Sequence, residues 1–221
     1  MSAEPAIKIV KSDKVKRKQS THQQLRVVIV GHVDHGKSTL IGRLLYDTNS
    51  LPEGKAEEIE AICKRRGTDV VEWSFVLDAF QAERDQAITI DSTQIWFSTD
   101  HRDYVIIDAP GHREFLKNMI SGDAAILVVD GSEGVQEQTR RHAYLLHLLG
   151  LQQIAVVVNK MDMVKHDPEA FENVSREVRD YLHSIGVTPR FIIPISARHG
   201  DMIAGRGDSM DWYSGKTLIE V

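Results

Sequence analysis

The sequence predicts an α/β domain in which helices cover both faces of a mostly parallel sheet. Short runs of β-branched residues alternate along the chain with segments of helical periodicity. The strand-like runs are too continuously apolar to face water, as is typical of parallel strands between two helical layers. A glycine-rich loop joins the first of these runs to the first helical segment, and this arrangement is typical of phosphate-loop folds.

The individual elements follow from local patterns. Apolar runs predict strands at residues 25–30, 88–98, 104–107, 124–129, 154–158 and 191–195. Apolar spacing predicts helices around 40–45, 53–66, 136–149 and 171–185. Gly150 is expected to end the third helix, while Asp167 and Pro168 are expected to begin the fourth. Residues 199–216 are rich in Gly, Asp and Ser, and we expect a loop there.

Composition limits the classes of function. The 221 residues carry a net charge of −5, which disfavours a generic polyanion binder. The single cysteine, Cys63, excludes an intrachain disulfide, and no apolar run has the length of a membrane span. We therefore expect a soluble cytoplasmic protein.

Residues 1–24 hold six basic and two acidic residues. They are expected to be a flexible basic tail, and contact with nucleic acid is a less favoured alternative. The folded domain is expected at 25–221.

The segment GHVDHGKS fits the phosphate-loop pattern of two glycines followed by Lys and Ser. Glycine lets backbone N–H groups turn toward a triphosphate, and the next helix presents its positive N-terminus to the anion. Lys37 would supply charge between the β- and γ-phosphates, and Ser38 a ligand for Mg²⁺. A ligand-free turn is the alternative. The loop residues assigned to the nucleotide are Gly31, His32, Val33, Asp34, His35, Gly36, Lys37, Ser38 and Thr39.

Asp108 follows the predicted strand at 104–107 directly and begins the segment DAPGH. A carboxylate beside the phosphate loop can bind Mg²⁺ directly or through water, and Gly111 lets a backbone N–H approach the γ-phosphate. Taken alone, the segment is equally consistent with a strand followed by a turn.

Two further segments point to guanine. Asp162, in NKMD after the strand at 154–158, can accept both the N1–H and the N2 amine of guanine, whereas adenine lacks this donor pair. Asn159 can brace the loop, and the stem of Lys160 can lie along the base. In the segment after the last strand, the Ala197 N–H is predicted to meet guanine O6. That segment comprises Ser196, Ala197 and Arg198.

In this order the segments resemble the translational-factor-like GTPases, and GHVDHGKST and DAPGH look like elongation factor Tu and its relatives. The resemblance covers about residues 25–221, the GTPase (G) domain. Residues 77–91, 138–150 and 210–220 look most like the GTPase subunit of ATP sulfurylase, CysN, including its fusions to adenylylsulfate kinase. That resemblance implies GTP hydrolysis coupled to adenylyl sulfate formation, with GTP or GDP and Mg²⁺ bound and an adenylyl-transferring subunit as partner. An elongation-factor-like translational GTPase is the alternative.

The resemblance also assigns roles to single residues. Thr89 matches the Mg²⁺ ligand of the first switch, and His112 matches the histidine that orients the attacking water. Val33 and Ile88 match the apolar pair beside that histidine, and Asp34 matches an aspartate associated with a monovalent cation in some relatives. The catalytic set is therefore His112, Lys37 and Gly111. For His32 and His35, packing of the loop is favoured over ligation of a metal.

Two departures from the family pattern concern the switches. Ala87 stands where relatives have glycine, and the segment 119–125 is shorter than in relatives by about four residues, roughly one helical turn. Both leave open a nucleotide-binding switch with impaired hydrolysis. Relatives continue into two β-barrel domains, which we do not expect within these residues. A single phosphate loop also argues against a kinase domain here.

Overall fold

The computed structural model describes residues 24–67, 71–78, 94–99, 102–108 and 122–221. Its strands are β1 (Gln24–Gly31), β2 (Gln94–Ser98), β3 (Asp103–Asp108), β4 (Ala124–Asp130), β5 (Ile154–Asn159) and β6 (Phe191–Pro194). They form one sheet in the order β2-β3-β1-β4-β5-β6. Only the β2–β3 pair is antiparallel among the described strands, which confirms the mostly parallel sheet.

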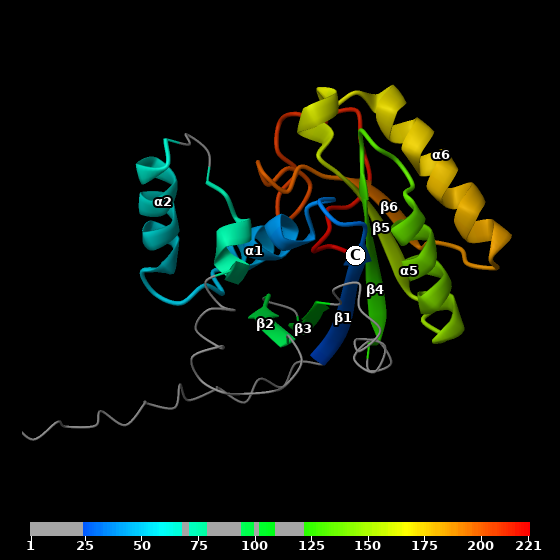
Figure 1. Cartoon of the computed structure of the whole chain (residues 1–221), viewed down its shortest axis with the longest axis horizontal. Coiled ribbons are helices and arrows are strands. Elements are labelled where there is room, and N and C mark those ends of the chain that lie inside the picture. The colour runs from blue at the N-terminus through cyan, green and yellow to red at the C-terminus, as the bar shows by residue number, and fades with distance from the viewer. Residues whose placement is uncertain (1–23, 68–70, 79–93, 100–101, 109–121) are drawn as a thin grey trace, which may run out of the picture.

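Helices lie on both sides of this sheet. They are α1 (Lys37–Asp47), α2 (Lys55–Arg65), α5 (Glu137–Leu148), the 3-10 helix η2 (Met161–Val164) and α6 (Pro168–Ser184). Figure 1 shows α1 on one side of the sheet and α5 with α6 on the other, while α2 stands beyond α1. The expected two-sided cover is therefore confirmed.

The core forms where the sequence is most continuously apolar. Residues 28–30 of β1 and 156–158 of β5 are completely buried, as expected for central parallel strands covered on both faces. On the first helix, Leu40, Ile41 and Leu45 face this core and are also buried. The spacing of these side chains is the reason that α1 packs against the sheet.

The residues at the helix ends adopt the conformations and contacts that their types predict. Gly150, two residues after α5, has a positive φ of 74°, which glycine adopts without strain. Asp167 caps α6 by accepting a 3.1 Å hydrogen bond from the Glu169 N–H, and Pro168 is the first helical residue. The loop expected at 199–216 contains isolated bridges but no helix or longer strand. Trp212 fastens it by donating from Nε1 to the His166 carbonyl at 2.9 Å.

Several predictions lie outside the described residues. They concern most of the basic tail, the first half of the strand expected at 88–98, and the shortened segment as far as residue 121. The same holds for the switch residues Ala87, Ile88, Thr89, Gly111 and His112. Within the described part of the chain, no helix is both long enough and apolar enough to cross a membrane.

Candidate nucleotide-binding site

The predicted segments gather at one edge of the sheet. The phosphate loop follows β1, Asp108 ends β3, Asn159 ends β5, and Ser196 comes two residues after β6. Because these strands are parallel, their carboxyl ends meet at the same edge, where ligands bind in open α/β sheets. The topology therefore brings together segments that are up to 165 residues apart, from Gly31 to Ser196.

The phosphate loop depends on its two glycines. Gly36 has a φ of 84° and immediately precedes α1, a conformation that side chains with a Cβ rarely adopt. A Cβ at Gly36 would overlap the Asn159 side-chain amide, and a Cβ at Gly31 would overlap the Val128 carbonyl. The loop can approach β4 and β5 this closely only because both positions are glycine.

Lys37 and Ser38 lie in the first turn of α1. The Lys37 ammonium donates hydrogen bonds to the carbonyls of Gly31 at 3.0 Å and His32 at 2.7 Å, so it lies across the curve of the loop. The Ser38 side chain is exposed beside it, and Thr39 is half-buried. Loop N–H groups, a helix N-terminus and an ammonium at one place suit a polyphosphate.

The middle of the loop turns outward. Asp34 is exposed with a φ of 62°, and the side chain of Val33 is also exposed. The Val33 N–H donates to Oε1 of Gln138 on α5 at 3.1 Å. Gln138 therefore holds the loop in place, a role that the sequence did not reveal.

The loop histidines pack in different places. His35 is completely buried and accepts a 3.2 Å hydrogen bond from the Asp130 N–H at Nδ1, while its Nε2 lies 3.4 Å from the Glu133 carboxylate. The His32 ring packs edge-on against it, with centroids 5.0 Å apart. Burial is the main reason that the pKa of His35 is lowered. His35 thus supports the loop from beneath as a neutral side chain, which agrees with the favoured packing role.

Asn159 joins the phosphate side of the site to the base side. Its side chain is 1% exposed, donates from Nδ2 to the His35 carbonyl at 2.9 Å, and accepts at Oδ1 from the Ala197 N–H at 3.0 Å. One amide therefore holds two loops that follow different strands. The structure places the bracing contact where the sequence suggested it.

The Ala197 N–H, which the sequence assigned to guanine O6, has a protein partner in this structure. It donates to Asn159 Oδ1 at 3.0 Å. Its contact with guanine O6 stays a prediction. Arg198 is exposed, and its guanidinium lies 3.9 Å from the Glu72 carboxylate.

Asp162 has an orienting partner in Ser196. The buried Ser196 hydroxyl donates to Asp162 Oδ1 at 2.7 Å. Asp162 is the second residue of η2, which begins directly after Lys160, and its side chain is half-buried. Because each carboxylate oxygen accepts more than one hydrogen bond, the group retains capacity for two donors of a base. No individual role for Ser196 was predicted, since a serine 34 positions from Asp162 carries no local signal for this contact.

Lys160 also has a partner that the sequence did not indicate. Its ammonium lies 2.7 Å from Oδ2 of Asp130, the buried last residue of β4. The only available signal is positional, since Asp130 ends an apolar strand just as Asn159 ends the next one in the sheet.

The backbone is compatible with a Mg²⁺ site near the loop. Asp108 ends β3 and stands opposite Ile29 of β1, two residues before Gly31. The exposed Ser38 hydroxyl lies at the start of α1, beyond the same loop. Oxygen ligands from a hydroxyl and a carboxylate suit Mg²⁺. Thr89, the third predicted ligand, is outside the described residues.

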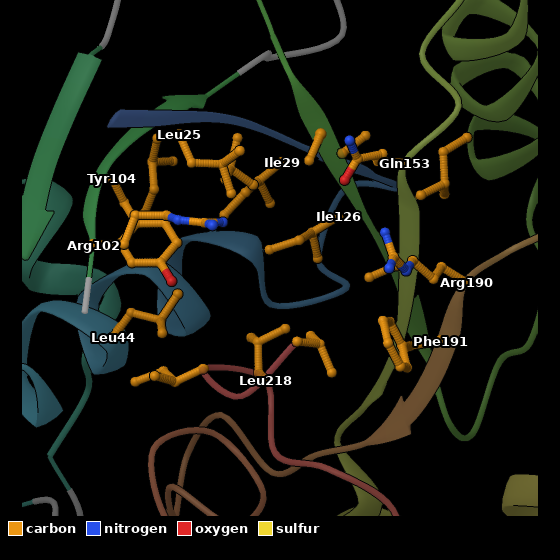
Figure 2. A pocket seen from close by; sticks show the side chains of 18 of the residues that line it. Leu25, Ile29, Leu44, Arg102, Tyr104, Ile126, Gln153, Arg190, Phe191 and Leu218 are labelled. Atoms are coloured by element: carbon orange, nitrogen blue, oxygen red, sulfur yellow. The ribbon is translucent and has the colours of Figure 1, made fainter. Parts of the chain in front are cut away.

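A separate apolar pocket lies away from these segments. Figure 2 shows it over the amino-terminal halves of the strands, between Leu44 of α1 and Leu218 near the C-terminus. Its lining includes Leu25, Tyr104 and Phe191, and none of its lining residues belongs to a predicted nucleotide segment. The nucleotide segments follow the opposite, carboxyl ends of these strands, so we do not assign the pocket to the nucleotide.

Comparison with known proteins agrees with the motif order. Residues 22–220 match the family described as elongation factor Tu GTP binding domain. The chain is 47% identical over 200 residues to elongation factor 1-alpha of Pyrococcus abyssi, and likewise to that of Thermococcus celer. Each alignment covers 89% of this chain and 46% of the relative. The chain therefore spans about half the length of the curated relatives it matches.

Solved structures show the same fold. Sup35 complexed with GDP matches with a TM-score of 0.65 and 26% identity, over 96% of this chain and 46% of that one. The GTPase-like domain of S. cerevisiae Ski7, bound to GDP and inorganic phosphate, matches with a TM-score of 0.70 over 90% of this chain and 48% of that one. Because the two sequences are only 22% identical, this match supports the fold alone.

The comparisons distinguish between the two family resemblances that the sequence suggested. The two curated relatives are elongation factor 1-alpha proteins, and the matching family is that of the elongation factor Tu GTP binding domain, so both support the elongation factor Tu-like resemblance. They do not support the finer resemblance to a sulfurylase subunit. Proteins of this type bind GTP or GDP with Mg²⁺. The chain belongs to the elongation factor Tu GTP-binding domain family.

Proposed function

We propose that this chain is the guanine-nucleotide switch of an elongation-factor-like translational GTPase. The observation that carries the proposal is the joined pair of loops, in which Asn159 links the phosphate loop to Ala197 while Ser196 orients Asp162. The 47% identity to elongation factor 1-alpha supports the translational assignment. A cytoplasmic location and the ribosome as partner belong to the same proposal.

Each end of the nucleotide has its own residues. The loop N–H groups, the N-terminus of α1 and the Lys37 ammonium bind the phosphates. Mg²⁺ is bound by Ser38, Thr89 and Asp108. Asp162 accepts the two guanine donors, and the stem of Lys160 lies along the base.

Hydrolysis transfers the γ-phosphoryl group to water. The water oxygen bonds to the γ-phosphorus as the bond from that phosphorus to the β–γ bridging oxygen breaks. His112 orients the water, the Gly111 N–H contacts the γ-phosphate, and Lys37 stabilises charge on the phosphate oxygens. Catalysis is then mostly positioning and charge stabilisation.

Sulfate activation is the second candidate, and only the stretches 77–91, 138–150 and 210–220 favour it. In that case the partner is an adenylyl-transferring subunit rather than the ribosome. The relatives favour the translational reading. A third hypothesis is that the chain binds GTP or GDP without efficient hydrolysis, and it depends on Ala87 and the short 119–125 segment.

One assay separates these candidates. GTP hydrolysis by the purified chain is measured alone, with ribosomes, and with an adenylyl-transferring subunit plus ATP and sulfate. Stimulation by ribosomes that His112→Ala abolishes supports the proposal. Stimulation only by the sulfurylase mixture supports the second candidate. Tight GTP binding with slow turnover that His112→Ala leaves unchanged supports the third.

A further inference from the structure

Asp130 is a buried carboxylate between the two nucleotide loops. It is the last residue of β4 and is 1% exposed. Both carboxylate oxygens are engaged, because Oδ2 pairs with the Lys160 ammonium at 2.7 Å and Oδ1 accepts from the Ser132 N–H at 2.7 Å and the Ser132 hydroxyl at 2.6 Å. A buried charge is tolerated only when it is paired and hydrogen-bonded in this way.

The contacts of Asp130 favour its ionised form. Burial is the largest influence and by itself would raise the pKa, but the hydrogen bonds from Lys160 and Ser132 together outweigh it and lower the pKa of this carboxyl. Asp130 therefore offers Lys160 a permanent negative charge near neutral pH.

This charge fixes a flexible side chain. Lys160 has a φ of 60°, and its side chain is 32% exposed. A free lysine side chain populates many rotamers, and ordering it has an entropic cost. Pairing the ammonium with Asp130 orders the stem before any nucleotide arrives, which is preorganisation of the binding surface.

The backbone of the same region contacts the phosphate loop. The Asp130 N–H donates to Nδ1 of His35, beneath the loop, at 3.2 Å. The next residue, Gly131, donates its N–H to the Asn159 carbonyl at 2.8 Å. The end of β4 thus touches the phosphate loop on one side and the base loop on the other.

We propose that Asp130 is a positioning residue for the guanine nucleotide, which acts by holding the Lys160 stem beside the base. The inference rests on the proposed guanine site. Asp130 is expected to set how long the nucleotide stays bound and not the rate of the chemical step, because both of its carboxylate oxygens are engaged by Lys160 and Ser132. A purely structural carboxylate would affect stability without acting through Lys160.

The test is a double-mutant cycle on nucleotide release, with Asp130→Asn, Lys160→Met and the double variant. Dissociation of fluorescent GDP is timed by stopped flow, and cleavage of bound GTP by Asp130→Asn is measured in a single turnover. Each single variant is expected to speed GDP release about tenfold, and the double variant to stay within about twofold of Lys160→Met. Cleavage of GTP already bound to Asp130→Asn, measured in a single turnover, is expected to remain within about twofold of the wild type, because that measurement does not include nucleotide release.

The control variant is Asp123→Asn. Asp123 immediately precedes the other end of β4, and its carboxylate accepts the Arg26 N–H at 2.9 Å. This variant removes a carboxylate beside the amino-terminal end of β4, away from both nucleotide loops, so its GDP release should match the wild type.

Unchanged GDP release in a folded Asp130→Asn variant would overturn the inference, as would additive effects in the double variant. If Asp130→Asn alone fails to fold, Lys160→Met is compared with the double variant, in which neither member of the pair carries a charge. Equal release rates then support the inference, and faster release from the double variant contradicts it. If the wild-type chain binds no GDP at all, the proposed function itself has failed, and that result is distinct from either outcome.

Discussion

The Asn159 side-chain amide donates a 2.9 Å hydrogen bond to the carbonyl of His35, across 124 positions of sequence. The same side chain accepts from the Ala197 N–H at 3.0 Å. Since all these atoms lie in the buried part of the site, water does not replace the contacts easily. The geometry of the phosphate loop therefore depends on a residue of the base loop.

Asn159→Ala is expected to weaken both stability and binding. Each lost hydrogen bond contributes about 1 kcal/mol, so the free energy of unfolding should fall by about 2 kcal/mol. GTP affinity should fall about tenfold or more, because both loops lose their common support. Urea unfolding and nucleotide titration measure the two effects. Gln153→Ala, at the exposed start of β5, is the control, and equal affinities of both variants would refute this role of Asn159.

Gly36→Ala tests the close approach of the phosphate loop to Asn159. Gly54 provides a matched control, because it also has a positive φ, 79°, but nothing lies within 4 Å of a Cβ placed there. Both substitutions carry the backbone strain of about 1 kcal/mol, but only Gly36→Ala displaces Asn159. Gly36→Ala should reduce GTP affinity at least about tenfold, while Gly54→Ala leaves it unchanged. Similar affinities of the two variants would show that the overlap is unimportant.

Asp162→Asn should change base selectivity. An amide in place of the carboxylate cannot accept both guanine donors, whereas its N–H₂ can donate to the extra oxygen of xanthine. GTP affinity is expected to fall by about a hundredfold and XTP affinity to rise, as read by competition with fluorescent GDP. Ser196→Ala removes the orienting contact with Asp162 and the 3.3 Å hydrogen bond from the His199 N–H but keeps the carboxylate, so it should weaken GTP binding without favouring XTP. Unaltered GTP affinity in Asp162→Asn would contradict the base assignment.

Stability should decrease in mild acid because of two buried histidines. Burial is the main cause of the lowered pKa of His35 and of His142, with the Lys37 charge adding to the effect at His142. The unfolded chain takes up protons at both residues as the pH falls through about 6.5, while in the folded protein these histidines stay neutral to lower pH. The unfolded state therefore binds more protons below that pH, and the free energy of unfolding falls there.

Urea unfolding at about pH 7.5 and about pH 5.5 measures this loss of stability. His142→Asn should reduce the pH dependence, because the substituted residue does not titrate. His183→Asn, on the exposed side of α6, is the comparison variant. An unchanged pH dependence in His142→Asn would exclude His142 as a source.

The features that sequence predicts well here are local. The apolar runs, the two loop glycines and the Asp167–Pro168 helix start each depend on neighbours within a few residues, and the structure confirms the elements they predict. The four-residue η2 after Lys160 was not predicted, since so short a 3-10 turn has no distinct periodicity.

The partners inside the site could not be predicted in the same way. Asp130 meets Lys160 and Ser196 meets Asp162 only because neighbouring strands end at one edge of the sheet. The contact between the Ala197 N–H and Asn159 could not be predicted for the same reason, since nothing local shows that the Asn159 amide reaches this N–H. Residue types predicted the class of ligand, and the topology determined which side chains hold one another.

The central claim is that this chain is a guanine-nucleotide switch, and competitive titration with GDP and ADP in the presence of Mg²⁺ tests it most directly. A site that hydrogen-bonds both guanine donors should prefer GDP by about a thousandfold or more, because adenine leaves the Asp162 carboxylate without donors. Equal affinity for the two nucleotides, or no binding of GDP, would contradict the account.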